Sequence, residues 1–172
     1  MKRLLSVLTK SLFLILVAHS TYAQEDSLEV VVPSSQEANI RCIVPPAGFE
    51  VSTAFNGYLS MPNSAAIIMM QINNANYLKI AEGMTEEWCA ANNLKLLSSS
   101  TLESDYGVKG RIFKLSFMLE GDEWIRYMVF AGDLEKTLWL NITYPHKLEE
   151  LIEGEVLKSL KTVNLNPDSD ED

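Results

Sequence analysis

The stretch VKGRIFKLSFMLEGDEWIRYMVFAGDLEKTLWLNITY, residues 108–144, decides the fold that the sequence predicts. Because side chains alternate between the two faces of a strand, its first part places four apolar residues on one side: Phe113, Leu115, Phe117 and Leu119. The segment EGDE, residues 120–123, is typical of a hairpin turn. Two more apolar runs follow at residues 124–131 and 137–144. We therefore expect an antiparallel meander of three strands with at least one strongly apolar face.

The residues before the meander add strands and helices. SAAIIMMQI, residues 64–72, is apolar at both alternating positions, which is typical of a strand buried on both faces. Residues 39–51 favour a strand that runs into a turn fixed by prolines and a glycine. Residues 77–82 favour a short helix, and Thr85 is placed to cap a second one.

The segment HKLEELIEGEVLKSLK, residues 146–161, follows Pro145 and predicts a helix with one buried face. Apolar residues near helical spacing are expected on that face: Leu148, Leu151, Ile152, Val156 and Leu160. The neighbouring acids Glu149 and Glu150 are expected to face solvent. The order strand, helix, meander, helix predicts an α+β domain over residues 38–165, with one antiparallel sheet of about six strands covered by helices.

The first 23 residues read as a secretory signal peptide. Lys2 and Arg3 begin the chain, an apolar run follows, and small residues at positions 21 and 23 predict cleavage after Ala23. The apolar run is shorter than the roughly 20 residues needed to cross a bilayer, and no cysteine follows it as a lipoprotein would require. We therefore expect a periplasmic or secreted protein that is not a lipoprotein and has no membrane span in its mature chain.

Charge limits the partners of the protein. The chain has 14 basic and 23 acidic residues and a formal net charge of −9. Three bases lie in the predicted leader, so the mature chain would keep 11 bases against 23 acids, a charge of −12. Nucleic-acid binding is not expected, because it depends on lysine and arginine neutralising phosphates. Residues 24–37 are expected to form a flexible lead-in, and the acidic residues 166–172 a disordered tail.

Few residues suited to catalysis are present. His19 lies in the predicted leader, so His146 is the single histidine of the mature chain, and no zinc-ligand spacing is seen. The sequence has no phosphate-binding glycine loop and no dinucleotide fingerprint, so we expect neither a metal nor a cofactor. Cys89 with His146 is the available nucleophile and base, but Glu86 and Glu87 just before Cys89 oppose thiolate formation.

Cys42 and Cys89 have two interpretations. Two cysteines in an exported chain suggest a disulfide, because the periplasm and the exterior are oxidising. Cys42 also alternates with Ile40 and Val44, and a buried thiol behaves as a small apolar residue. A bridge and two buried thiols therefore both remain open.

Tryptophans suggest a binding surface. Trp139 occupies the polar register of its predicted strand, so it either lies under a helix or lines an exposed ligand or partner surface. Trp124 and Arg126 share one register on the neighbouring strand and would extend such a patch. The three residues form our candidate binding patch.

Several segments together resemble the PsbP-like superfamily. They are PPAGFEV at residues 45–51, FNGYLS at 55–60, SAAIIMMQI at 64–72, the meander, and LKSLKTV at 157–163. The superfamily includes protein P of the photosystem II oxygen-evolving complex, a Ran-binding nuclear import factor and small exported bacterial proteins of the DcrB type. The resemblance implies an α/β/α sandwich that serves as a binding or assembly module without catalysis.

These observations predict a non-catalytic, monomeric binding or assembly module at the bacterial cell envelope, whose partner is another envelope protein. Two alternatives are a small cysteine-dependent enzyme that uses Cys89 and His146, and a carrier with a small-ligand cleft between helix and sheet.

Overall fold

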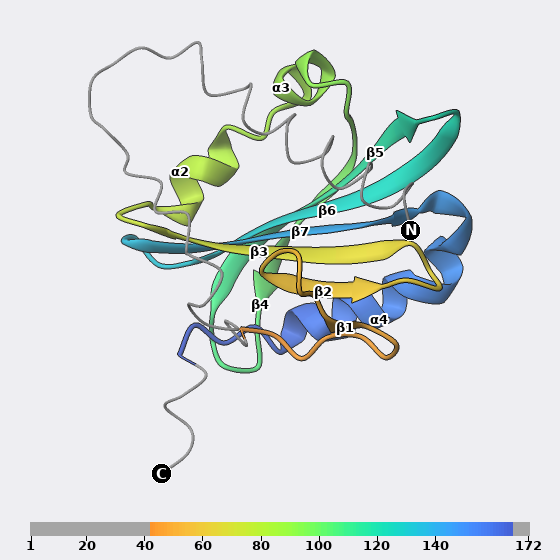
Figure 1. Ribbon diagram of the computed structural model, residues 1–172. Coiled ribbons are helices and arrows are strands. Elements are labelled where there is room, and N and C mark those ends of the chain that lie inside the picture. The colour runs from red at the N-terminus through yellow and green to blue at the C-terminus, as the bar shows by residue number, and fades with distance from the viewer. Residues whose placement is uncertain (1–41, 167–172) are drawn as a thin grey trace.

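The structure, a computed structural model, describes residues 42–166. One antiparallel β-sheet runs through this part of the protein (Figure 1). The sheet has seven strands in the order β1-β2-β3-β7-β6-β5-β4. The strands are β1 (Glu50–Val51), β2 (Gly57–Ser60), β3 (Ala65–Asn73), β4 (Lys95–Glu103), β5 (Lys109–Leu119), β6 (Asp122–Gly132) and β7 (Lys136–Pro145). With its helices the sheet makes an α+β fold, as the sequence predicts.

Some predicted segments lie outside the described residues. They are the signal peptide 1–23 with cleavage after Ala23, the lead-in 24–37, and the acidic tail beyond Asn166. These expectations stay predictions.

The strand count differs from the expected number of about six. The strand expected at the start of residues 39–51, before the proline turn, is irregular from Cys42 onward, and the last two residues of that segment alone form β1. Both side chains of β1 are exposed, so this strand carries no alternating apolar pattern by which the sequence could reveal it.

The predicted meander is confirmed as β5, β6 and β7. Leu119 pairs with Asp122, so the hairpin between β5 and β6 has a loop of two residues, Glu120 and Gly121. Their φ angles are 54° and 91°. Positive φ at both loop positions matches the turn whose twist suits a two-residue hairpin, and glycine adopts it without strain.

Three α-helices cover the sheet within the described residues: α2 (Tyr77–Glu82), α3 (Glu86–Ala91) and α4 (Glu149–Lys161). A 3₁₀ turn, η1 (His146–Leu148), leads into α4. The Thr85 hydroxyl accepts a hydrogen bond from the Trp88 amide at 3.1 Å, which confirms the predicted cap of α3. None of the helices within residues 42–166 has the length and apolarity needed to cross a membrane.

The helices pack on opposite faces of the sheet (Figure 1). Strand β6 shows the division, because its side chains alternate between two apolar clusters. Tyr127 and Val129 join the cluster that contains the buried residues of α4. Met128 and Phe130 join the cluster that contains α2 and α3. We call these the α4 face and the α2–α3 face.

Helix α4 buries a narrower stripe than predicted. Ile152, Val156 and Leu160 are buried, at the spacing of one helix face. Leu151 was expected to join them but is 66% exposed. It precedes Ile152 by one residue, and the rotation of about 100° per residue turns its side chain away from the sheet.

Gly57 begins β2 at a point of very close approach between strands. A Cβ atom at this position would lie 1.9 Å from the Ile67 carbonyl oxygen of β3, and the φ angle is +143°. Both the space and the backbone conformation therefore require glycine here.

Candidate functional site

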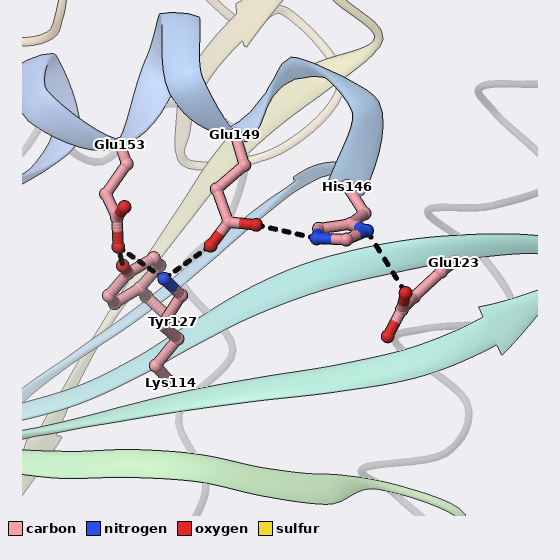
Figure 2. Close-up of polar contacts among 6 residues, drawn as sticks. All are labelled: Lys114, Glu123, Tyr127, His146, Glu149 and Glu153. Carbon is pink, nitrogen blue, oxygen red and sulfur yellow. Dashed lines mark hydrogen bonds and ion pairs between the residues drawn. The ribbon is translucent and has the colours of Figure 1, made fainter.

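Helix α4 presents two carboxylates to the sheet, at Glu149 and Glu153, one helical turn apart. Lys114 of β5 and Tyr127 of β6 are directly opposite in register and project from the same face toward them (Figure 2). Lys114 pairs with Glu149 and with Glu153, and its Nζ lies 2.5 Å from Glu153 Oε1. The Tyr127 hydroxyl donates to that same oxygen. We call these four residues the α4 anchor.

The contacts set the charges of the α4 anchor. The pKa of Glu153 is lowered by its hydrogen bond from Lys114, then by the one from Tyr127. Partial burial lowers the pKa of Lys114, but the bonds to Glu149 and Glu153 outweigh this and raise it. Burial, followed by Glu153, raises the pKa of Tyr127. At neutral pH the anchor is thus a cation between two carboxylates, with a neutral tyrosine as hydrogen-bond donor.

His146 extends the α4 anchor to the start of the helix. Its Nε2 lies 2.8 Å from Glu149 Oε2, and its Nδ1 lies 3.1 Å from Glu123 Oε2 on β6 (Figure 2). The imidazole ring therefore lies between two carboxyl groups, with one ring nitrogen facing each of them. His146 is half exposed, and it connects η1, α4 and β6.

The structure does not bring Cys89 to His146. Cys89 is buried on α3 within the cluster on the α2–α3 face. His146 pairs with Glu149 on the α4 face. Burial, then the charge of Glu86, raises the pKa of the Cys89 thiol, so the side chain is held as a neutral thiol. The sheet separates the two members of the candidate dyad.

Cys42 and Cys89 are not bridged to each other. Cys42 is buried in the cluster on the α4 face, where its carbonyl accepts a hydrogen bond from the Asn164 amide at 2.8 Å. Cys89 lies in the cluster on the other face. Of the two interpretations left open by the sequence, the structure therefore has two buried thiols.

The candidate binding patch is divided and buried. Trp139, Trp124 and Arg126 lie on the same face, but each is less than 10% exposed. Trp139 pairs with Phe130 and packs in the cluster that contains α2, so it lies under a helix. Trp124 pairs with Pro145, which lies six residues after Trp139 on β7. The two tryptophans are therefore far apart along the strands and do not meet. Of the two alternatives for Trp139, the structure has burial under a helix, and the three residues do not form one exposed patch.

Trp124 and Arg126 do meet around Phe117. The Arg126 guanidinium lies 4.5 Å from the centre of the Phe117 ring, and the Trp124 ring centre lies 6.5 Å from it. Burial lowers the pKa of Arg126 to about 10, so the group is still a cation at neutral pH. Stacking on an aromatic face stabilises such a cation.

Sequence reasoning missed most of the α4 anchor. Glu149 was expected to face solvent, yet its side chain is 21% exposed and paired with Lys114. The sequence pattern gave no role to Lys114 or Tyr127. The available signal was the spacing of Glu149 and Glu153 on the same side of a helix as Ile152 and Val156.

Comparisons with known proteins place this site in no family. No protein-family model and no curated protein matches the sequence. Among solved structures, a protein of unknown function from Pseudomonas aeruginosa is similar, with 13% identity and a TM-score of 0.45 over 58% of this chain and 72% of that one. A likeness at this level carries no argument about function. Within residues 42–166, no group of three or more His, Cys, Asp or Glu side chains could hold a metal ion.

Proposed function

We propose that the protein is an exported bacterial protein that acts as a non-catalytic binding or assembly module at the cell envelope, with a PsbP-like fold in three layers. The observation that carries the proposal is the position of Cys89. This thiol is buried on the α2–α3 face with a raised pKa, while His146 is paired with carboxylates on the α4 face. The two groups that the alternative, a cysteine-dependent enzyme, would need are therefore separated.

The α4 anchor supports the same proposal. Its lysine, tyrosine and glutamates bond to one another and join α4 to β5 and β6. Groups bonded in this way stabilise a docked helix. The basic start of the chain and its apolar run support export through a signal peptide.

A genetic test separates binding from catalysis. The full chain, its Cys89→Ser variant and its His146→Gln variant would be produced in a bacterium that lacks the gene. Envelope fractions would be photo-crosslinked, and captured proteins identified by mass spectrometry. We expect all three proteins to reach the envelope fraction, to capture the same partner and to restore the deletion phenotype equally.

Two results would contradict the proposal. A variant that keeps the thermal stability of the parent and still captures the partner, yet fails to restore the phenotype, would favour a cysteine-dependent enzyme. Recovery of the protein in the cytoplasmic fraction alone would contradict export.

A further inference from the structure

Strand β4 lies at an edge of the sheet, and it is long and exposed. It pairs with β5 on one side, and no strand of the described residues lies on its other side. Of its nine side chains, that of Leu102 alone is buried. An exposed edge strand of this length presents backbone groups to which another chain can add as a further strand.

The register shows which backbone N–H and C=O groups of β4 point away from β5. The Ser104 amide donates to the Val108 carbonyl at 3.0 Å, and the pairs Leu102 with Gly110 and Ser100 with Ile112 continue this register. Bonded and non-bonded pairs alternate along an antiparallel ladder, so Leu102 and Ser100 bond to β5. Ser99 and Thr101 lie between the bonded positions, and their backbone N–H and C=O groups point away from β5.

A second contact agrees with this assignment. Glu103 lies two residues after Thr101, so it also occupies a position that does not bond to β5, and its carbonyl should point away from β5. That carbonyl accepts a hydrogen bond from Lys161 Nζ at 2.9 Å, from the end of α4. At the other end of β4, the irregularity in register between Leu96 and Ser98 interrupts the regular edge. The outward edge that is open to another strand thus extends over residues 98–102, about 17 Å.

The edge is basic in an acidic protein. Apart from Lys114, which is paired with two glutamates in the α4 anchor, strands β4 and β5 carry three bases and one acid: Lys95, Lys109, Arg111 and Glu103. These four residues carry a net charge of +2, whereas the whole chain has −9. Arg111 lies directly opposite Thr101 in register, and the side chains of Thr101 and Ser99 beside it are small. A carboxylate on an added strand would therefore come within reach of the Arg111 guanidinium.

We propose that β4 is a docking edge for an extended acidic segment of a partner protein, which adds to the sheet beside Ser99 and Thr101 and directs a carboxylate to Arg111. This inference rests on the proposed binding function and names the chemistry of the partner. A second copy of the chain fits less well, because pairing two β4 edges would place two basic surfaces side by side.

Proline substitutions test the edge with matched controls. Thr101→Pro removes an outward N–H while leaving the ladder to β5 intact, which edge strands tolerate. Thr101→Ala keeps that N–H, whereas Ser100→Pro removes an N–H that bonds β5. We expect the unfolding temperature to fall clearly only for Ser100→Pro. Ser99→Pro provides a second edge variant, should Thr101→Pro fold poorly.

The binding probe is a fluorescent peptide of alternating threonine and glutamate, with a threonine and lysine peptide as its counterpart. We expect the full chain to bind the acidic peptide, and Thr101→Pro or Ser99→Pro to bind it about tenfold more weakly or worse. Arg111→Gln should weaken binding by about fivefold and reduce its salt dependence. Thr101→Ala should bind as the parent does.

Three results would overturn the docking edge. They are equal binding by the folded proline variants, equal binding of the basic peptide, and a concentration-dependent dimer that Thr101→Pro abolishes. The envelope crosslinking described above keeps the two proposals apart. A partner captured equally by the parent and by Thr101→Pro would leave the binding module standing and remove its proposed edge.

Discussion

Lys114 of β5 and Glu153 of α4 are 39 residues apart in the chain and form an ion pair with Nζ and Oε1 separated by 2.5 Å. The pair is partly buried, with side-chain exposures of 17% and 34%. Glu149 also bonds the lysine, and Tyr127 bonds Glu153. One cation therefore connects helix α4 to strand β5 of the meander.

Loss of this cation should destabilise the protein. Lys114→Met would leave Glu149 and Glu153 close together and without their partner, so we expect the free energy of unfolding to fall by about 1–3 kcal/mol. Urea denaturation at pH 7 measures the change. Lys158→Met is the matched control, because Lys158 is 75% exposed and pairs with Glu155 on α4 alone. Its effect should stay within about 0.5 kcal/mol, and equal effects of the two variants would refute the role of the anchor.

The α4 anchor also predicts the response to acid. Because the folded-state pKa of Glu153 is lowered, its contribution to stability is present above the unfolded-state pKa and disappears as the pH falls through the folded-state pKa. Glu153→Gln should therefore lose stability at pH 7, and its difference from the parent should shrink as the pH falls through the folded-state pKa of Glu153. Glu150→Gln, an exposed acid on the same helix, serves as the control. Parallel pH curves for the parent and Glu153→Gln would contradict this account.

Cys89 should react slowly in the native protein. Its thiol is buried, and burial raises its pKa, so little thiolate is available to a labelling reagent. We expect a thiol reagent to label both cysteines rapidly only after unfolding, and mass spectrometry of the untreated protein to find no bridge. Rapid labelling at neutral pH would instead indicate an accessible nucleophile.

Gly57 should tolerate no side chain. Gly57→Ala would place a Cβ atom against the Ile67 carbonyl and strain the backbone, so we expect a loss of about 2–4 kcal/mol or failure to fold. Gly154→Ala in α4 has open space around its Cβ and should stabilise by about 0.5–1 kcal/mol, because alanine favours the helix. Thermal unfolding compares the two, and a stable Gly57→Ala protein would contradict the described pairing of β2 and β3.

The sequence predicted the elements with strong local patterns. The meander, the Thr85 cap and the helix over residues 146–161 all follow from alternation, capping or helical spacing within a few residues. The two-residue β1 was missed because it has too few residues for any period. Leu151 was assigned to the wrong face because apolar character alone cannot distinguish adjacent positions on a helix.

The candidate site was harder to predict, because its contacts join residues that are far apart in the chain. The α4 anchor forms only once α4 crosses β5 and β6, so no local pattern identifies Lys114 or Tyr127. The same applies to Cys89 and His146, whose separation follows from the placement of helices on opposite faces. A sequence pattern predicts which face a residue of a strand occupies more readily than it predicts which residue of a distant helix that side chain will contact.

Hydrogen exchange at β4 tests the binding account most directly. In the free protein, the amides of Ser99 and Thr101 should exchange faster than those of Ser98 and Ser100, which bond to β5. On saturation with the acidic peptide, exchange at Ser99 and Thr101 should slow by about tenfold or more, with little change at Ser98 and Ser100. Saturated binding that leaves the Thr101 amide at its original exchange rate would contradict the docking of a partner strand at this edge.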